Sequence, residues 1–405
     1  MFLRKFSVAV ICSTLLFVPS LSVKAASFSD GEIIQVQHFQ KEYAHLDKKQ
    51  YDITNLYQVK PRLNKKFKAG QLKKDYISKQ LAYINYYRSL FGLPAITTTK
   101  AANLNAQKTA AVMAAINANP FINQHGLPND VRPKYINRAT WKVAQDTTET
   151  SNLNFNVTNQ SAGDVITDLL TDHYNLTGTD TGHRAWILST RLSSTGIGAA
   201  YGNNGYRYSV QKVLNVDDLF NEASQETVAY PSSGLFPIEL AKGKRVAWSL
   251  YLSNRSYNGT PKITITDQDT GKTYNAKNVK NFSKNGYGNF KTVITYLPGK
   301  TPLVAGHAYK VTIGKLTKYS FKLFKEDTNT PSESASSAVT TVQKGSVQQD
   351  TYLKTAFSKT SAKLWASFNP QIKNQDSFHY FDALKKGQWH QSTFLRRVLQ
   401  VKNKQ

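Results

Sequence analysis

The stretch DTGHRAWILSTRLSSTGIGAAY, residues 180–201, combines two patterns that predict how the surrounding chain folds. A polar loop delivers His183 to the start of an apolar helical turn. The small-residue run at 196–200 then predicts a strand that another element can approach closely. A single histidine at such a boundary is also typical of an ordinary surface position, so its meaning depends on residues elsewhere in the chain.

The residues before this stretch predict three helices and a second loop histidine. Apolar residues recur at three- and four-residue steps from Ile77 to Leu90, which indicates an amphipathic helix. An alanine-rich helix at 99–118 should pack closely on a sheet. His125 follows in a loop, and residues 131–160 read as a polar segment. A third helix, 163–173, carries Asp172 at its end.

Length and charge limit the class of protein. The chain has 405 residues, 40% of them hydrophobic, which suffices for two or more packed domains. Its formal net charge is +26 and its pI is about 9.8. Such a balance indicates anionic surroundings: nucleic acid, membrane or a phosphate-rich cell wall.

The N-terminus predicts secretion. Residues 1–25 combine a basic start, an apolar stretch and small residues before a cleavage point after Ala25. A transmembrane anchor is the alternative, but the apolar stretch is short for one. Cys12, the single cysteine, lies inside this segment. A secreted mature chain of this size without cysteine indicates a bacterial, extracellular protein.

Two motifs resemble the CAP superfamily (cysteine-rich secretory, antigen 5 and pathogenesis-related proteins) in its bacterial, SCP-like form. YINYYRSLFGLPAI, residues 83–96, is similar to the first-helix signature of that family. GHRAWILSTRLSSTGIGAA, residues 182–200, is similar to its histidine motif and central strand. The resemblance covers about residues 77–215. It implies an α/β fold, an α-β-α sandwich with helices on both faces of a small mixed sheet.

The resemblance also implies a cleft with two histidines and two acids, which binds a divalent metal such as Zn²⁺ in some relatives. His125 and His183 match the histidines, and Asp172 matches the acid at the end of the third helix. The family motif places a second acid where this chain has Ser151. Glu149 lies two residues earlier and would substitute only with a shift of the backbone.

Two functions from different classes follow. Two imidazoles and a carboxylate can hold zinc with an open position, and they can also form a purely structural hydrogen-bonded network. We find no Gly-x-Ser-x-Gly elbow, no cysteine in the mature chain and no His-Glu-x-x-His helix. These absences and the incomplete acid set favour binding of wall polymer, lipid or a host surface over catalysis. The alternative is a metal-assisted hydrolase of wall or peptide substrates.

The composition divides the rest of the chain. We predict an N-terminal extension at 26–75, the CAP domain at 76–227 and an immunoglobulin-like β-sandwich at 228–325, where short alternating strands recur. In this sandwich the sequence shows no site. Residues 326–350 are rich in serine, threonine and glutamine and predict a flexible linker.

Residues 351–405 mix aromatic side chains with lysine and arginine. Such a segment suits an anionic polymer that offers stacking faces. After a signal peptide we expect teichoic polymers or peptidoglycan of a Gram-positive, lactobacillus-like wall rather than nucleic acid. A basic tail without a particular partner is the alternative. Because the sequence ends without Leu-Pro-x-Thr-Gly or a hydrophobic tail, we expect non-covalent attachment.

Overall fold

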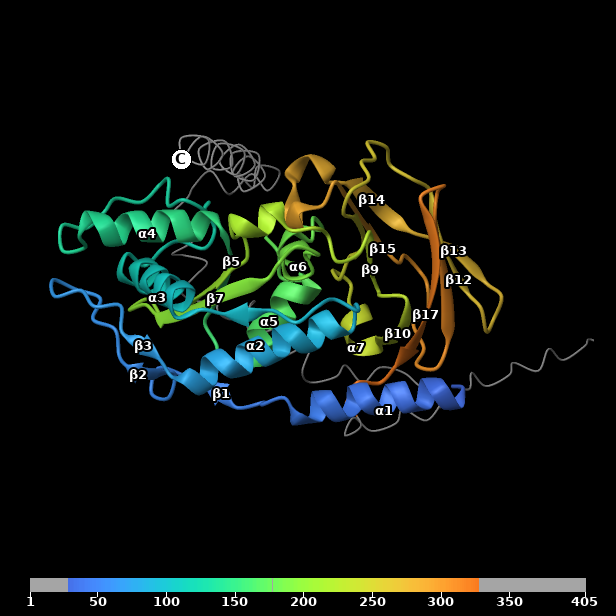
Figure 1. Cartoon of the computed structure of the whole chain (residues 1–405), viewed down its shortest axis with the longest axis horizontal. Coiled ribbons are helices and arrows are strands. Elements are labelled where there is room, and N and C mark those ends of the chain that lie inside the picture. Colours follow the sequence, from blue (N-terminus) through green and yellow to red (C-terminus); the bar gives the residue numbers. More distant parts are fainter. Residues whose placement is uncertain (1–27, 177, 328–405) are drawn as a thin grey trace, which may run out of the picture.

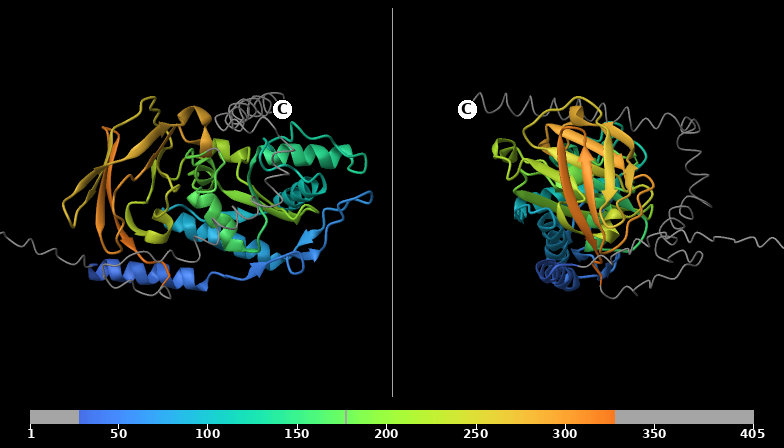
Figure 2. Two further views of the ribbon diagram at one scale, coloured as in Figure 1. Left: turned by 180° about the vertical axis from the view of Figure 1, so that it is seen from behind. Right: turned by 90° about the vertical axis from the view of Figure 1, so that its right-hand side faces the viewer.

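The computed structural model describes residues 28–176 and 178–327. The predicted signal peptide at 1–25, all but the start of the predicted linker and the predicted wall-binding module at 351–405 lie outside these residues. Figure 1 shows a helix-rich region joined to a region of β-strands, with helix α1 (Asp30–His45) running along one side of the molecule. Figure 2 shows the same arrangement from behind and from one side. Among the described residues, the helices are too short or too polar to cross a membrane.

The helix-rich region is built on a four-stranded sheet of order β4-β7-β8-β5. Strands β4 and β7 are parallel, and the other two pairs are antiparallel. The mixed sheet agrees with the predicted α/β class. Its strands are β4 (Thr97–Thr98), β5 (Ser151–Asn156), β7 (Ser194–Tyr201) and β8 (Arg207–Lys212).

Glycines in β7 set the distance to helix α3 (Lys100–Ala115). A Cβ on Gly196 would lie 2.5 Å from the Ala102 carbonyl oxygen, and one on Gly198 would lie 2.2 Å from Ala106. No larger residue fits there without moving the helix. The small-residue run in the sequence therefore has the predicted function of close packing.

Helices cover both faces of this sheet. On one face, Leu153 and Val210 share a core with α3 and with Trp141 of helix α4 (Arg138–Glu149). On the other face, Ile197 packs with Tyr76 of α2 (Lys74–Ser89) and Ala162 of α5 (Ala162–Thr171). Because successive strand residues point to opposite faces, one short sheet supports both cores.

Residues 131–160, for which the sequence predicted a polar segment and no helix or strand, contain α4 and β5. Asn137 begins α4, since its side chain accepts a hydrogen bond from the Thr140 amide. The buried side of the helix carries Trp141 and Ala144 but also Thr147 and Thr148. Two threonines on the buried side hide the apolar periodicity that would have predicted the helix.

The strand-rich region contains two sheets whose inner faces meet. Trp248 of one sheet lies edge-on to Phe321 of the other, with ring centroids 5.4 Å apart. The identification of this region as immunoglobulin-like stays a prediction. One sheet has the order β10-β17-β16-β12-β13 and comprises Gly234–Pro237, Thr317–Phe324, Ala308–Ile313, Ile263–Asp267 and Thr273–Asn275. The other has the order β14-β15-β11-β9 and comprises Lys277–Asn281, Thr292–Leu297, Trp248–Leu252 and Thr227–Tyr230.

The two regions share one hydrophobic core. Ile166, Leu170 and Ile187 of the helix-rich region belong to the same buried cluster as Tyr251 and Phe290 of the strand-rich region. Apolar burial therefore continues across the junction, and the two regions stabilise each other.

The N-terminal extension packs on the molecule. Helix α1 (Asp30–His45) begins with a capping box formed by Ser29 and Glu32. Gln40 donates to the Lys325 carbonyl at 2.7 Å, and Glu32 pairs with Lys322. Glu326, at the start of the predicted linker, is buried and accepts a hydrogen bond from Tyr86.

The remaining elements are β1 (Gln50–Tyr51), β2 (Tyr57–Val59), β3 (Gln71–Leu72), β6 (Gln160–Ser161), α6 (Gly182–Ile187), α7 (Ile238–Ala241) and the 3-10 turns Asp217–Phe220, Ser283–Asn285 and Tyr287–Asn289.

Candidate functional site

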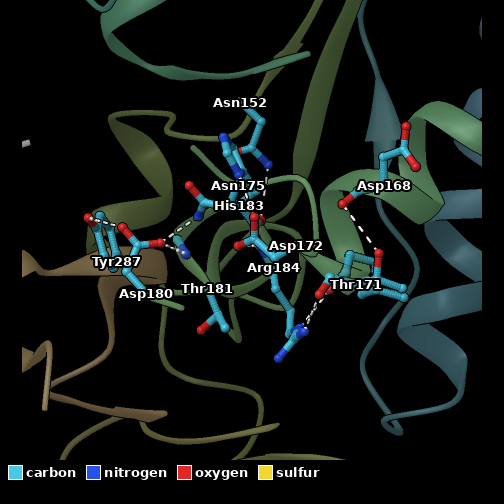
Figure 3. A network of polar contacts seen from close by, with 12 residues as sticks. Asn152, Asp168, Thr171, Asp172, Asn175, Asp180, Thr181, His183, Arg184 and Tyr287 are labelled. Atoms are coloured by element: carbon cyan, nitrogen blue, oxygen red, sulfur yellow. Dashed lines mark hydrogen bonds and ion pairs between the residues drawn. The ribbon is translucent and has the colours of Figure 1, made fainter. Parts of the chain in front are cut away.

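Asp172, at the end of helix α5, lies next to His183, in the first turn of helix α6 (Figure 3). Asp172 ends α5 in the left-handed conformation, with φ 56°. Its Oδ1 lies 2.7 Å from His183 Nδ1, and its side chain is 2% exposed against 20% for His183. The main chain thus turns a nearly buried carboxylate toward an imidazole that stays partly accessible.

Opposing effects act on the His183 imidazole. Burial lowers its pKa, but the neighbouring Asp172 carboxylate raises it, with a smaller contribution from Asp180, so the pKa lies above its ordinary value. In the neutral ring, an Nδ1–H that donates to Asp172 leaves Nε2 with a free lone pair. The pair therefore favours an oriented, basic imidazole.

His125 is fixed in a similar way by helix α4. Its Nδ1 lies 2.7 Å from the Thr148 carbonyl oxygen, and the Gly126 amide donates to Thr148 Oγ1 at 3.0 Å. Burial, with a smaller contribution from the charge of His183, lowers the pKa of His125 to about 4 against the raising effect of the Thr148 contact. The charge of His183 is thus felt at His125, and at neutral pH His125 is uncharged with its Nε2 lone pair available.

Glu149 lies beside His125. It is the last residue of α4, and a Cβ on Gly126 would lie 2.5 Å from its Oε2. Gly126 also has φ +78°, so both space and backbone require glycine there. Burial, with Asp146 nearby, raises the pKa of Glu149 to about 7. Its Oε1 is buried without a hydrogen-bond partner in the described part of the chain.

Ser151, the other candidate for the second acid position, begins strand β5 and is buried. Its backbone pairs with Lys212, and its hydroxyl has no partner among residues 28–176 and 178–327. Of the two candidates, Glu149 is the carboxylate next to a histidine. The helix end brings it there without a distortion of β5.

Sequence reasoning missed two residues that hold the His183 loop. Asp180 Oδ1 accepts hydrogen bonds from Asn175 Nδ2 at 2.6 Å and from the Gly182 amide at 3.1 Å. Asn152 donates to the His183 carbonyl oxygen at 3.1 Å. An aspartate two residues before a helix-starting glycine is a recognisable signal for the first contact. The second contact depends on strand pairing and left no local pattern.

A second group of potential metal ligands lies in the strand-rich region. Asp267, Asp269 and His307 offer ligand atoms within 4.8 Å of one another, the one such group of three found in the described ranges. Their atoms already stabilise a turn. Asp267 Oδ1 accepts from the Asp269 amide at 3.0 Å, and Asp269 Oδ2 accepts from the Ala308 amide at 2.7 Å. His125 and His183 do not form a comparable triad with an acid.

Residues 81–213 match the family model of CAP, the cysteine-rich secretory protein family. This part of the chain, which contains His125, Glu149, Asp172 and His183, is therefore a CAP domain. No curated protein gives a significant match to the chain.

Proposed function

We propose that this protein is secreted by a Gram-positive bacterium, stays non-covalently associated with the cell wall and acts mainly by binding, with a divalent metal held at His125 and His183. Wall polymer, lipid or a host surface is the ligand class. The observation that carries the metal proposal is the common arrangement of the two histidines. Each ring has its Nδ1 fixed by an oxygen acceptor, Thr148 in one case and Asp172 in the other.

The two histidines fit a zinc ion that is held by only two protein ligands. A histidine that ligates zinc through one nitrogen usually donates its other N–H to a carboxylate or carbonyl, which fixes the ring. Both rings satisfy this condition, and both are neutral above the pKa of His183. Among the described residues the two histidines form no group of three ligands with an acid. Two protein ligands favour a metal that exchanges and accepts an outside ligand, unlike a closed structural site. When bound, zinc would supply a positive charge for an anionic ligand group.

Metal titration by calorimetry tests this proposal. We expect the full chain to bind one zinc ion, and we expect His125→Ala and His183→Ala to weaken zinc binding by roughly 100-fold or more, since each removes one of two ligands. His307→Ala is the matched control, because His307 also contacts an aspartate but lies in the other region. Zinc binding that survives both cleft substitutions and is lost in the control would refute the proposal.

The wall association has separate support and a separate test. The net charge of +26 and the mixture of lysine, arginine and aromatic residues at 351–405 suit teichoic phosphate and glycan. Sedimentation with purified walls should carry down the full chain much more than a chain that ends at Asp350. Substitution of Trp365 and Trp389 with alanine should weaken sedimentation without changing the net charge. Equal sedimentation of all forms would refute the attachment.

One observation supports metal-assisted hydrolysis as a second function. A carboxyl whose pKa is about 7, next to a histidine and with one oxygen lacking a partner, suits a general acid or base near neutral pH. Glu149 would then transfer a proton at Oε1. Turnover of wall fragments that falls by roughly 100-fold or more in Glu149→Gln would establish this role. Zinc binding without turnover would leave binding as the function.

A further inference from the structure

The loop that presents His183 is held from outside the CAP domain. The Tyr287 hydroxyl donates to Asp180 Oδ2 at 3.1 Å, and its ring lies 3.3 Å from where a Cβ on Gly182 would be (Figure 3). Tyr287 lies in the strand-rich region, about a hundred residues further along the chain. Tyr287 therefore binds one oxygen of the Asp180 carboxylate. The other oxygen accepts the hydrogen bond from the Gly182 amide at the start of α6.

The same loop carries backbone strain at Thr181. This threonine precedes α6 and has φ 56°, in the left-handed region that β-branched residues rarely adopt. A threonine in this position usually caps the helix with its hydroxyl, but here no such bond forms. The Thr181 hydroxyl instead lies 2.7 Å from the Tyr251 hydroxyl, which also donates to the Thr181 carbonyl at 3.4 Å.

A close backbone contact completes the junction. Gly288, next to Tyr287, has φ +63°, and a Cβ there would lie 2.2 Å from the Ala185 carbonyl oxygen. The turn of the strand-rich region is therefore pressed against α6 itself. Tyr251 and Phe290 stack behind it with ring centroids 4.9 Å apart. Rigid aromatic side chains on both sides leave the loop one packed conformation.

We propose that Tyr287 and Tyr251 are positioning residues of the CAP cleft: the strand-rich region holds the Thr181–Arg184 turn in its strained conformation and so orients His183 toward Asp172 and His125. The region is thus part of the site's support and more than a spacer between the CAP domain and the wall-binding segment. The orienting effect on His183 does not depend on a metal. Its consequence for zinc rests on the proposed function.

Tyr287→Phe in the full chain is the main test, because it removes one hydroxyl and keeps the ring. Tyr309→Phe is the matched control. Tyr309 is a buried tyrosine of the same region whose hydroxyl contacts Pro302 and Val304 and no residue of the loop. Hydrogen exchange by mass spectrometry should show amides 180–185 opening roughly tenfold more often in Tyr287→Phe than in the control, after correction for global stability.

A spectroscopic measurement follows the ring itself. The Nδ1 proton of His183, shared with Asp172, should exchange faster with water in Tyr287→Phe and stay unchanged in Tyr309→Phe. Tyr251→Phe should also speed the exchange of this proton, and it replaces Tyr287→Phe as the test variant if Tyr287→Phe does not fold. Loop exchange and Nδ1 signals that match the control in both variants would overturn the proposal.

Zinc affinity separates this inference from the proposed function. If the wild type binds zinc, Tyr287→Phe should weaken binding roughly tenfold and Tyr309→Phe should not. Unchanged affinity in Tyr287→Phe would count against the orienting effect. If the wild type binds no zinc, the proposed function fails, and the two metal-free measurements still decide whether the strand-rich region positions His183.

Discussion

Two histidine–aspartate pairs in this protein have similar geometry and different surroundings. His183 lies 2.7 Å from Asp172, with side chains 20% and 2% exposed. His307 lies 3.0 Å from Asp267, with side chains 17% and 3% exposed. Neither distance nor burial distinguishes the pair in the CAP cleft from the pair in the strand-rich region.

The neighbours distinguish them. Asp267 accepts backbone hydrogen bonds from the tight turn that follows it, so His307 completes a local structure. Asp172 lies at a helix end with positive φ, the charge of His183 acts on a second imidazole, His125, and Glu149 lies against Gly126. A histidine–aspartate pair therefore indicates a site only where a second functional group from another element faces it.

The largest expected effect on stability is at Arg184, the residue that follows His183. The chain has no corresponding arginine next to His307. The fully buried guanidinium of Arg184 donates to the Leu170 and Thr171 carbonyls and to Ala247, and it stacks on Tyr230. Arg184→Met should lower the free energy of unfolding by about 3–5 kcal/mol, because these carbonyls lose their partner. Chemical denaturation measures this effect.

Arg191→Met is the control for Arg184. Arg191 donates to Asn221 and Asn254 from a more exposed position and should lose about 1 kcal/mol or less. Equal losses in the two variants would mean that the junction between the regions adds nothing to stability.

Asp172→Asn tests the cleft pair directly. An amide in place of the carboxylate no longer holds the His183 ring in the orientation and basicity that favour zinc, so zinc affinity should fall by about 10–100-fold. Asp267→Asn should leave zinc affinity unchanged.

Asp172→Asn should also change how stability depends on pH, because the pKa of His183 is raised in the fold. The pair thus stabilises fully below the unfolded-state pKa of about 6.5, and this contribution is lost as pH rises through the folded-state pKa. Denaturation at several pH values should show Asp172→Asn losing most at low pH.

Glu149→Gln tests the acid beside His125. Because burial raises the pKa of Glu149 to about 7, the folded state disfavours the ionised form. Wild-type stability should fall as pH rises from about 4.5 to 7, and the variant should escape this loss. We expect Glu149→Gln to be more stable than the wild type by about 1–2 kcal/mol at pH 8. The exposed Glu222→Gln is the control, and a matching pH dependence there would contradict the assignment.

His307→Ala should have the smallest effect on stability. It also tests the contrast between the His183–Asp172 pair and the His307–Asp267 pair. Loss of one contact to Asp267 should lower the free energy of unfolding by about 1 kcal/mol, while zinc binding and the cleft stay unchanged. A larger effect on zinc binding than that of His183→Ala would show that the metal site lies at Asp267, Asp269 and His307.

Most of the CAP fold follows from local sequence patterns. The steps of apolar residues from Ile77 to Leu90 predicted α2, and the alanine-rich segment predicted α3 on a sheet. Helix α4 was missed because Thr147 and Thr148 occupy buried positions where the pattern needs apolar side chains. Burial of threonine depends on backbone carbonyls that only the folded helix provides, so no local signal announces it.

Within the sequence, helix periodicity and small residues predicted α2, α3 and the close packing of β7, because these signals act over a few neighbouring positions. The resemblance of two motifs to the CAP superfamily named His125, His183 and Asp172. It left the second acid open between Glu149 and Ser151. Only the tertiary structure decided that Glu149 lies against Gly126 and that Tyr287 and Tyr251 reach the His183 loop. Such contacts join residues far apart in the chain, and their energies depend on packing that no single segment encodes.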